Sequence, residues 1–397
     1  MAAPTYYLVR NSELAAVAEV TYGTSAGAPT SSSFFKQEGD HSKFMPVREE
    51  FFRDGDRDYL RASVIEMATG RGRTTFEIPG RLVPSGNAAT PTAPDMGLLY
   101  KMLLGAAHTG TANTTTAAGS SGTSIVLTAG GGAASGVAKG DLIAISVSDV
   151  VGIEVRQVTN VATDTLAIDR ACTTDPAAGR SVYLGTTYSL SESTINSASF
   201  WLFLGAAIRY QMLGGIISEG TIDVNHSANV PEAKVSFKGE GQPLATHSTA
   251  RPTFTSAGAV LCPDTGKVWI AGTKFNVVQS KLTINNGLQL RSRESDALVP
   301  NGAARTANKS RYKVDMDLDM YLTDAVEMAT LFAGGDSRTA RDVMVQLGQT
   351  AGKIVAWRTP AFRPKGEWGI QQEELGLKLS GRCLGTNGDD EVAIAFL

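Results

Sequence analysis

Apolar residues in this chain come in short runs, and glycine, asparagine, aspartate or proline interrupts them every few positions. The runs DLIAIS, GIEVRQVTNV and DTLAIDRAC, and later KVSFKGEG and SKLTINNG, are typical of this pattern. β-Branched runs of this length, bounded by turn residues, predict strands. A content of 42 glycines in 397 residues also favours many turns. We therefore expect a mainly β protein with few helices.

The chain carries little net charge. Its 36 lysines and arginines nearly balance 39 aspartates and glutamates, which leaves a net charge of −3. This balance excludes a nucleic-acid binder that works by bulk positive charge, and equally an acidic disordered tail. The three cysteines, Cys172, Cys262 and Cys383, lie far apart, and their odd number argues against a disulfide framework.

Neither a secretory signal nor a membrane span is expected. The N-terminus lacks a basic head followed by an apolar run. The most apolar stretch, Phe200–Ile208, has nine residues, whereas a membrane-spanning helix needs roughly 20. We expect a protein that is made and kept in a reducing cytoplasm, or in a particle assembled there.

Shifts in composition divide the chain into parts. The segment EVTYGTSAGAPTSSS has no helical or strand period, which is typical of an extended arm. No charged residue occurs between Lys101 and Lys139, and TGTANTTTAAGSSG at 109–122 is typical of a flexible linker. The expected parts are an N-terminal arm (1–50), a first β fold (51–108 and 188–245), an inserted small all-β module (109–187) and a second β fold (254–397).

Two short helices indicate that the two β folds are copies. The helices superimpose at an offset of 229 residues, from Asp95 to Gly105 and from Asp324 to Gly334. Their apolar faces are Leu99, Met102 and Leu103 in the first helix, and Met328, Leu331 and Phe332 in the second. Strands flank both helices, the later ones at 342–347, 353–357, 374–380 and 391–396. This shared order predicts an internal duplication, with a short helix flanking each of two tandem β-sandwiches.

The run VDMDLDMYL contains the best candidate for a metal site. A calcium loop of the EF-hand type starting at Asp315 needs glycine and glutamate where Met320 and Val326 stand. The alternation instead has the period of a strand, with Asp315, Asp317 and Asp319 on one face. The four histidines have no partner at ligand spacing, and the sequence contains neither a nucleophile elbow nor a phosphate loop. We expect no catalytic residue, no cofactor and no metal.

The strand FWLFL is apolar on both faces. In a mainly antiparallel β protein one face of a strand commonly meets solvent, so a second apolar face indicates a covering partner. The candidate contact residues are Phe200, Trp201, Leu202, Phe203 and Leu204.

In their order, the segments of this chain resemble the tail tube proteins of long, flexible-tailed bacteriophages. The resemblance covers about residues 1–108 and 188–397 and leaves the inserted module aside. The segments that carry it are EVTYGTSAGAP, REEFFRDGDRD, TTFEIPGRLVPS, PDMGLLYKMLLGAA, MLGGIISEGTIDVN, KVSFKGEG, SKLTINNGLQLRS and YKVDMDLDMYLTDAVEMATLFAGG. Each segment is a diffuse signature, and the strength of the resemblance lies in their order.

The resemblance implies a structural virion protein without enzymatic activity. Such proteins are β-sandwiches with a flanking helix that form rings, and the rings stack into a hollow tube through which DNA passes without specific binding. The duplication favours a ring of three subunits with pseudo-sixfold symmetry, with a hexamer as second choice. Further partners would be the tape measure, tail terminator and distal tail proteins, with no membrane. The location would be the virion tail, assembled in the bacterial host cytoplasm.

This geometry gives each candidate a role. Ring closure would pair the free sheet edges of neighbouring subunits. A lumen with excess negative charge suits DNA passage, so Asp315, Asp317 and Asp319 are candidates to line it. The N-terminal arm and Phe200–Leu204 are candidates for contacts between subunits or successive rings. The module at 109–187 would project outward, because it would crowd a lumen.

Three other functions are alternatives. A tail-completion or distal-tail ring protein would form one ring and no filament. A carbohydrate-binding β protein would have its site on the inserted module and would need exposed aromatic residues there, yet residues 109–187 contain only Tyr183. A metal-dependent hydrolase is the weakest alternative, because the spacings of the candidate ligands match no metal site.

Overall fold

The computed structural model describes residues 12–34, 43–52, 67–204, 208–226, 232–253, 266–291, 302–305, 312–321, 339–371 and 374–397. These residues form 24 strands, two α-helices and one 3-10 turn, η2 (Ser31–Ser33), so the expectation of a mainly β protein is confirmed. The expected second helix, with Met328, Leu331 and Phe332, lies outside the described residues.

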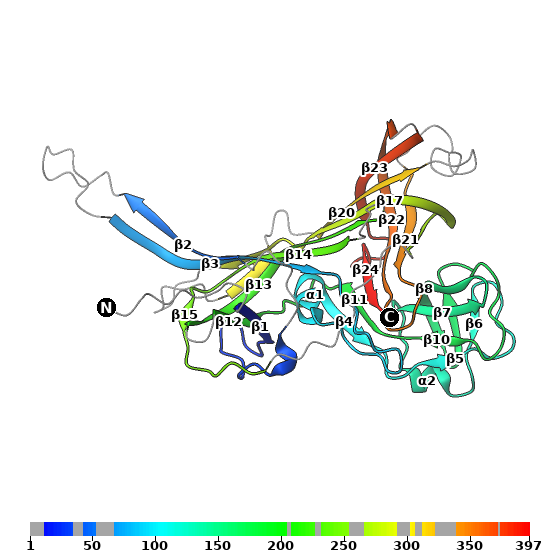
Figure 1. Ribbon diagram of the computed structural model, residues 1–397, viewed down its shortest axis with the longest axis horizontal. Helices are drawn as coiled ribbons and strands as arrows, with labels where there is room; N and C mark the ends of the chain where they lie inside the picture. The colour runs from blue at the N-terminus through cyan, green and yellow to red at the C-terminus, as the bar shows by residue number, and fades with distance from the viewer. Residues whose placement is uncertain are drawn as a thin grey trace, which may run out of the picture.

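Eight of these strands form one continuous antiparallel sheet across the middle of the molecule, which we call the long sheet (Figure 1). Its first four strands are, in spatial order, β2 (Lys43–Phe52), β3 (Met67–Arg81), β14 (Glu232–Gly241) and β13 (Ile208–Asn225). Its last four are β17 (Thr273–Asn285), β20 (Lys313–Tyr321), β23 (Glu374–Leu384) and β22 (Val355–Gln371). The pairing of β13 with β17 joins the two sets.

The two sets of four strands are copies in order and in register, and we call them the first and the second repeat. Asn225 pairs with Glu232 where β13 turns into β14, and Gln371 pairs with Glu374 where β22 turns into β23. Gly239 of β14 and Gly381 of β23 occupy the same place. A Cβ atom at Gly239 or Gly381 would lie 2.0 or 2.1 Å from a carbonyl oxygen of the adjacent strand. The duplication that the sequence predicts therefore extends to the strand register.

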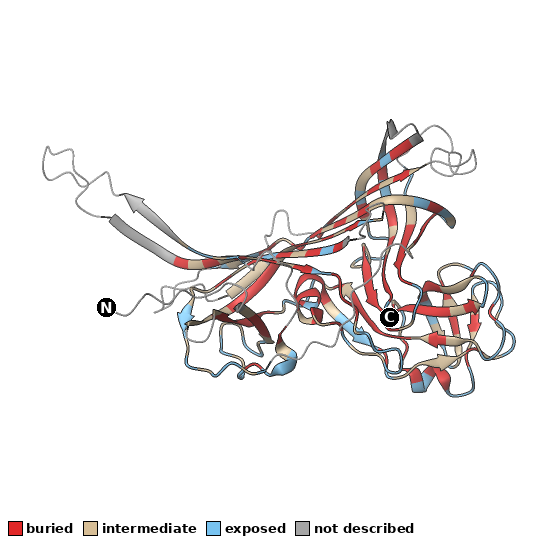
Figure 2. Cartoon of the chain, viewed as in Figure 1, coloured by how far each residue is buried: buried red, intermediate tan, exposed pale blue. Residues whose placement is uncertain are grey.

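One face of the long sheet is buried, and buried residues alternate along its strands with partly exposed ones (Figure 2). The helix α1 (Gly97–Leu104) packs on the buried face through Leu99, Met102 and Leu103, which are 1–2% exposed. Gly220 of β13 makes room for this helix, because a Cβ atom there would lie 2.3 Å from the Leu103 side chain. The helix ends at Gly105, whose φ of 103° favours glycine.

Each repeat has an outer layer that continues from the first residues of β13 or β22. In the first repeat the layer consists of β1 (Ser12–Ala18), β12 (Ala198–Leu204) and β15 (Ala245–Thr246). In the second it consists of β16 (Lys267–Ile270), β21 (Arg341–Leu347), β24 (Ala393–Phe396), β11 (Thr186–Leu190) and β4 (Gly105–Thr109). The core of the protein lies between these layers and the long sheet.

Residues 114–183 form a separate sheet with its own core, which we call the six-stranded module. Its strands are, in spatial order, β5 (Thr114–Thr115), β10 (Ser181–Tyr183), β7 (Leu142–Ser148), β8 (Gly152–Ala162), β9 (Thr165–Ile168) and β6 (Ser124–Val126), with α2 (Gly131–Ser135) beside β5. A further hairpin pairs β18 (Leu288–Arg291) with β19 (Gly302–Arg305).

The expectation of a flexible linker at 109–122 is wrong. Thr109 ends β4, Thr114 and Thr115 form β5, and Thr116 is fully buried. The Thr116 hydroxyl donates a hydrogen bond to the Ala177 carbonyl at 2.6 Å. Small polar residues are typical of linkers, but here their hydroxyls and backbone groups find partners inside a sheet.

Candidate assembly surfaces

The exposed face of the long sheet carries the acidic strand that the sequence analysis singled out. Along β20 the apolar residues Val314, Met316, Leu318 and Met320 are buried, whereas Asp315, Asp317 and Asp319 lie on the other face and are partly exposed. A row of carboxylates on one strand is favourable only if cations lie nearby, because like charges at this spacing repel.

The neighbouring strands supply those cations. Asp317 lies opposite Lys281 of β17, while Asp319 and Asp315 lie opposite Lys378 and Arg382 of β23. Lys313 Nζ is also 2.9 Å from a carboxylate oxygen of Asp315. Between the strands lies a small polar cleft of about 180 Å³, lined by Asp223, Gln279, Lys281, Asp317, Asp319 and Lys378.

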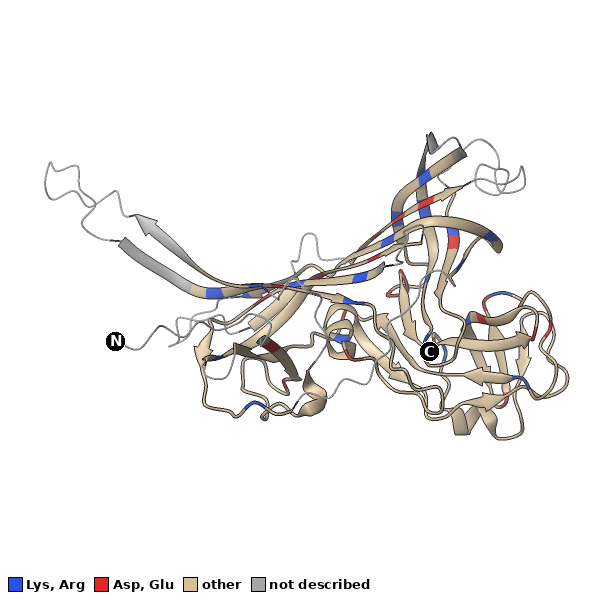
Figure 3. Cartoon of the chain, in the orientation of Figure 1, with Lys and Arg blue, Asp and Glu red and all other residues tan. Residues whose placement is uncertain are grey.

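Among the side chains that the structure describes, the exposed face does not carry excess negative charge (Figure 3). Its described acidic side chains are Glu77, Glu219, Asp223, Glu240, Asp315, Asp317 and Asp319. Its described basic side chains are more numerous: Lys43, Arg73, Arg81, Lys234, Lys238, Lys281, Lys313, Arg363, Lys365, Lys378 and Arg382. Opposite charges pair across strands, as in Lys238–Glu219 at 3.0 Å and Arg73–Glu240 at 3.3 Å. The three aspartates thus lie among cations of the neighbouring strands, and their place on a lumen wall stays a prediction.

The apolar strand β12 is covered within the same chain. Of its five candidate contact residues, Phe200, Trp201, Leu202 and Phe203 are buried and Leu204 is partly buried. β1 pairs with β12 along its whole length, from Ser12 opposite Leu204 to Ala18 opposite Ala198. The ring of Phe34 lies 5.8 Å from that of Phe203, and the ring of His247 lies 4.8 Å from that of Trp201. The apolar second face that suggested a subunit contact is therefore an internal surface.

The N-terminal segment that covers β12 is held by one carboxylate. Glu19 accepts hydrogen bonds from the hydroxyls of Ser197 and Ser199 at 2.8 and 2.9 Å, and from the backbone N–H groups of Gly23 and Gly214 at 2.9 and 2.8 Å. Burial and the nearby Glu19 raise the pKa of the Tyr22 hydroxyl above its ordinary value. Residues 12–34, expected to be part of an extended arm, thus pack against the body of the first repeat.

The six-stranded module packs on the outer layer of the second repeat, although it is inserted in the sequence of the first. Leu142, Ala144 and Val155 of the module pack against Met344 and Ala356, which belong to β21 and β22. This apolar contact fixes the module to the repeat that lies later in the chain.

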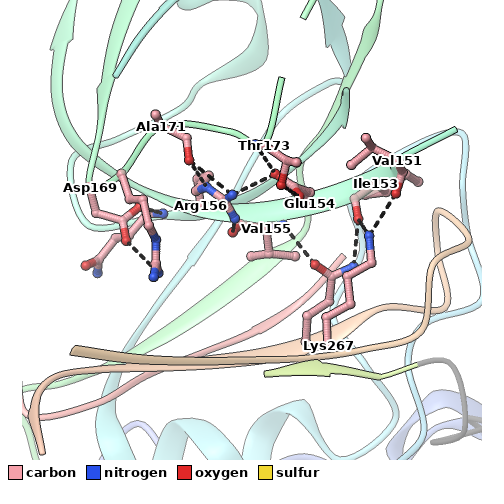
Figure 4. Close-up of polar contacts among 12 residues, drawn as sticks. Val151, Ile153, Glu154, Val155, Arg156, Asp169, Ala171, Thr173 and Lys267 are labelled. Atoms are coloured by element: carbon pink, nitrogen blue, oxygen red, sulfur yellow. Dashed lines mark hydrogen bonds and ion pairs between the residues drawn. The ribbon is translucent and has the colours of Figure 1, made fainter. Parts of the chain in front are cut away.

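Polar side chains frame this contact (Figure 4). Gln346 is fully buried, and its side chain accepts a hydrogen bond from Val155 N–H at 2.9 Å and donates one to the Ile153 carbonyl at 3.0 Å. Lys267 Nζ donates to the carbonyls of Val151 and Ile153 at 2.9 and 3.2 Å. Burial lowers the pKa of the Lys267 ammonium. The first half of β8, which pairs with β7 but not with β9, is thus bound by side chains of the second repeat.

A buried ion pair completes the contact. Arg156 and Glu154, both 2% exposed, lie 2.6 Å apart, and the Arg156 guanidinium stands 5.2 Å above the Trp269 ring. Nearby, Arg358 of β22 bonds to Gln157 and lies 3.1 Å from Asp169 of the module. Sequence reasoning missed these residues, because one Glu and one Arg in a strand of mixed polarity do not reveal which partner they meet.

Two edges of the long sheet are unpaired in the described residues. β2 ends the sheet on one side and pairs only with β3. On the other side β22 pairs with outer strands as far as Phe362, and from Arg363 to Gln371 it pairs only with β23. Free edges of this length are surfaces for strand addition.

The described residues hold no cluster of three or more His, Cys, Asp or Glu side chains that could bind a metal ion. Within the same ranges, no helix has the length and apolar character needed to span a membrane.

The family comparison agrees with the architecture. A family model described as phage tail tube protein matches residues 10–364. The match begins before β1, includes the outer layer of the first repeat and the six-stranded module, and ends within β22, before β23 and β24. No curated protein matches the chain. Since the matched region covers most of its length, this chain belongs to the phage tail tube protein family.

Proposed function

We propose that this protein is the structural subunit of a phage tail tube, which closes into rings that stack into a hollow channel for DNA. The observation that carries the proposal is the long sheet. It consists of two copies of one four-strand unit that are already joined side by side within the chain, and both of its outer edges are free in the part of the chain that the structure describes. A sheet built from repeats with free ends can close only by adding further copies.

The exposed face of the long sheet would line the channel, because the six-stranded module packs on the opposite side and would lie on the outside. Its polar side chains suit a wall that DNA passes without lasting contact. Pairs such as Lys238–Glu219 form across strands, and a cation that is paired with a carboxylate attracts a phosphate less strongly. The role is structural and non-enzymatic.

The two repeats per chain favour a ring of three subunits, which would present six repeats and pseudo-sixfold symmetry. A hexameric ring is the second choice. In the tail the rings would also meet the tape measure, tail terminator and distal tail proteins, and the subunits would be assembled in the host cytoplasm.

Electron microscopy of the purified protein over a range of concentrations tests the proposal. Hollow tubes of uniform diameter are expected, and their symmetry decides between three and six subunits. Rings that never stack would favour a tail-completion or distal-tail protein instead. A monomer at every concentration, which also fails to polymerise on added tail tips, would contradict the proposal.

A further inference from the structure

The junction between the two repeats gives a template for the junction between two chains. In this junction β13 and β17 pair from Glu219 opposite Asn285 to Asn225 opposite Gln279. Asn286 N–H donates to the Ser218 carbonyl, and His226 N–H donates to the Val278 carbonyl. Because amide directions alternate along a strand, the even-numbered residues of both strands turn their N–H groups towards each other.

Each strand of this junction has a counterpart at a free edge. β22 is the counterpart of β13, since Lys365–Ser380 and Gln371–Glu374 repeat the pairs Glu219–Lys238 and Asn225–Glu232. β2 is the counterpart of β17, since the run from Lys43–Glu77 to Val47–Arg73 repeats the run from Lys281–Asp317 to Asn285–Lys313. The two repeats therefore place the free edges in the same relation as the two strands of the internal junction.

We propose that β22 of one chain pairs antiparallel with β2 of a second copy in the register of the internal junction. Superposition of the repeats then sets Lys365 opposite Val47, Glu367 opposite Met45 and Gly369 opposite Lys43 of the second copy. This inference rests on the proposed ring but goes further, because it names both strands and the register between them.

Pro46 distinguishes this junction from the internal one. It superimposes on Ile284, whose N–H group points towards β13 in the internal junction. The nitrogen of Pro46 would thus point out of the sheet, where a missing donor costs no bond to β3. In the single chain this proline blunts the free edge, and in the ring it leaves the junction between chains one hydrogen bond short.

Cross-linking of the assembled protein tests the register. Met45 is 57% exposed, and the pair Met45–Glu367 is the counterpart of Thr221–Thr283, a non-hydrogen-bonded pair. Such pairs have Cα atoms about 4.5 Å apart, within the range of about 4.4–6.8 Å that a disulfide spans. Three double cysteine variants are needed: M45C/E367C for the proposed register, M45C/G369C for a register shifted by two residues, and T221C/T283C as the internal control.

We expect M45C/E367C to form disulfides between chains, in a ladder that ends at the subunit number of the ring, and T221C/T283C to form them only within a chain. Hydrogen exchange adds a readout on the unmodified chain. On ring formation the amides of Gly366, Trp368 and Ile370 should gain protection, whereas those of Lys365, Glu367 and Gly369 are paired with β23 throughout.

Two outcomes would overturn the register and leave the tube function standing, provided that the wild-type chain forms rings. In one, M45C/G369C cross-links and M45C/E367C does not. In the other, neither variant cross-links and the amides of β22 gain no protection. A wild-type chain that forms no ring, even with tail tips, would defeat the tube function and the register with it.

Discussion

The two repeats share one four-strand plan, yet their outer layers are closed by different means. In the first repeat, strand β12 is covered by the N-terminal segment, with β1 and Phe34, and by His247 from the connection to the second repeat. In the second, strand β21 is covered by β16 and by a folded module with its own core. The comparison teaches that the sheet is the part that the two repeats share, whereas their outer layers are covered by unrelated segments of the chain.

The largest effects should fall on the duplicated sheet, and equally on both copies. We expect Gly239→Ala and Gly381→Ala each to lower the free energy of unfolding by about 3 kcal/mol, because the new Cβ would overlap a carbonyl oxygen. Urea unfolding measures both values. Gly27→Ala is the control, since no atom lies within 4 Å of its Cβ position. A clear difference between the two variants would break the equivalence of the repeats.

The module contact of the second repeat should come next. Gln346→Leu keeps the size of the side chain but leaves the buried Val155 N–H without its acceptor, so we expect a loss of about 2 kcal/mol. The Val155 amide should also exchange faster, as mass spectrometry can show. Thr350→Val, at an exposed position nearby, should change neither quantity. An unchanged Val155 amide in Gln346→Leu would mean that the module is held by its apolar contact alone.

A change of the Glu19 carboxylate, which anchors the N-terminal segment in the first repeat, should have a slightly smaller effect on stability. Glu19→Gln retains the shape but replaces one acceptor oxygen by a donor, which faces the donors of the anchor, so we expect a loss of about 1.5 kcal/mol in urea unfolding. Glu13→Gln is the matched control, because among the described residues Glu13 forms a partly exposed pair with Arg251 at 3.5 Å, and such pairs contribute little to stability. Equal losses for Glu13 and Glu19 would show that the N-terminal segment is not anchored by this carboxylate.

The smallest effect concerns pH and only the first repeat. Burial, followed by the nearby Arg209, lowers the pKa of His247 below its usual value of 6.5. The unfolded chain then binds the proton first, so this contribution to stability is present above about pH 6.5 and is lost as the pH falls towards the folded pKa. His247→Phe should keep the ring against Trp201 and flatten this part of the pH profile, measured by thermal unfolding between pH 7 and pH 5 relative to wild type. An identical profile for both proteins would contradict it.

Sequence patterns predicted the mainly β class because strand alternation is local. In the run VDMDLDMYL, apolar and polar residues alternate, and this alternation matches the buried and exposed faces of β20. β22 was underestimated for the same reason. A strand was expected at 353–357, but the structure continues it from Val355 to Gln371 through Pro360 and Pro364, residues that usually end strands.

The partners of exposed or apolar faces could not be predicted, because they depend on segments far apart in the chain. Nothing near Phe200 in the sequence indicates that Ser12–Ala18 will pair with its strand. In the same way, the cations opposite Asp317 and Asp319 are Lys281 and Lys378, which lie on two other strands. Local composition therefore predicted where these faces lie, but not which residues contact them.

The position of the six-stranded module affects the symmetry that the outer surface of a ring presents to other molecules. It is present once in each chain, whereas the strand unit of the long sheet is present twice. In a ring of such chains the bore would repeat twice as often around the axis as the outer surface does. A molecule that passes through the bore would meet the same strand unit twice per chain. A molecule that binds from outside would meet one six-stranded module per chain, so the outer surface would show the number of polypeptides in the ring.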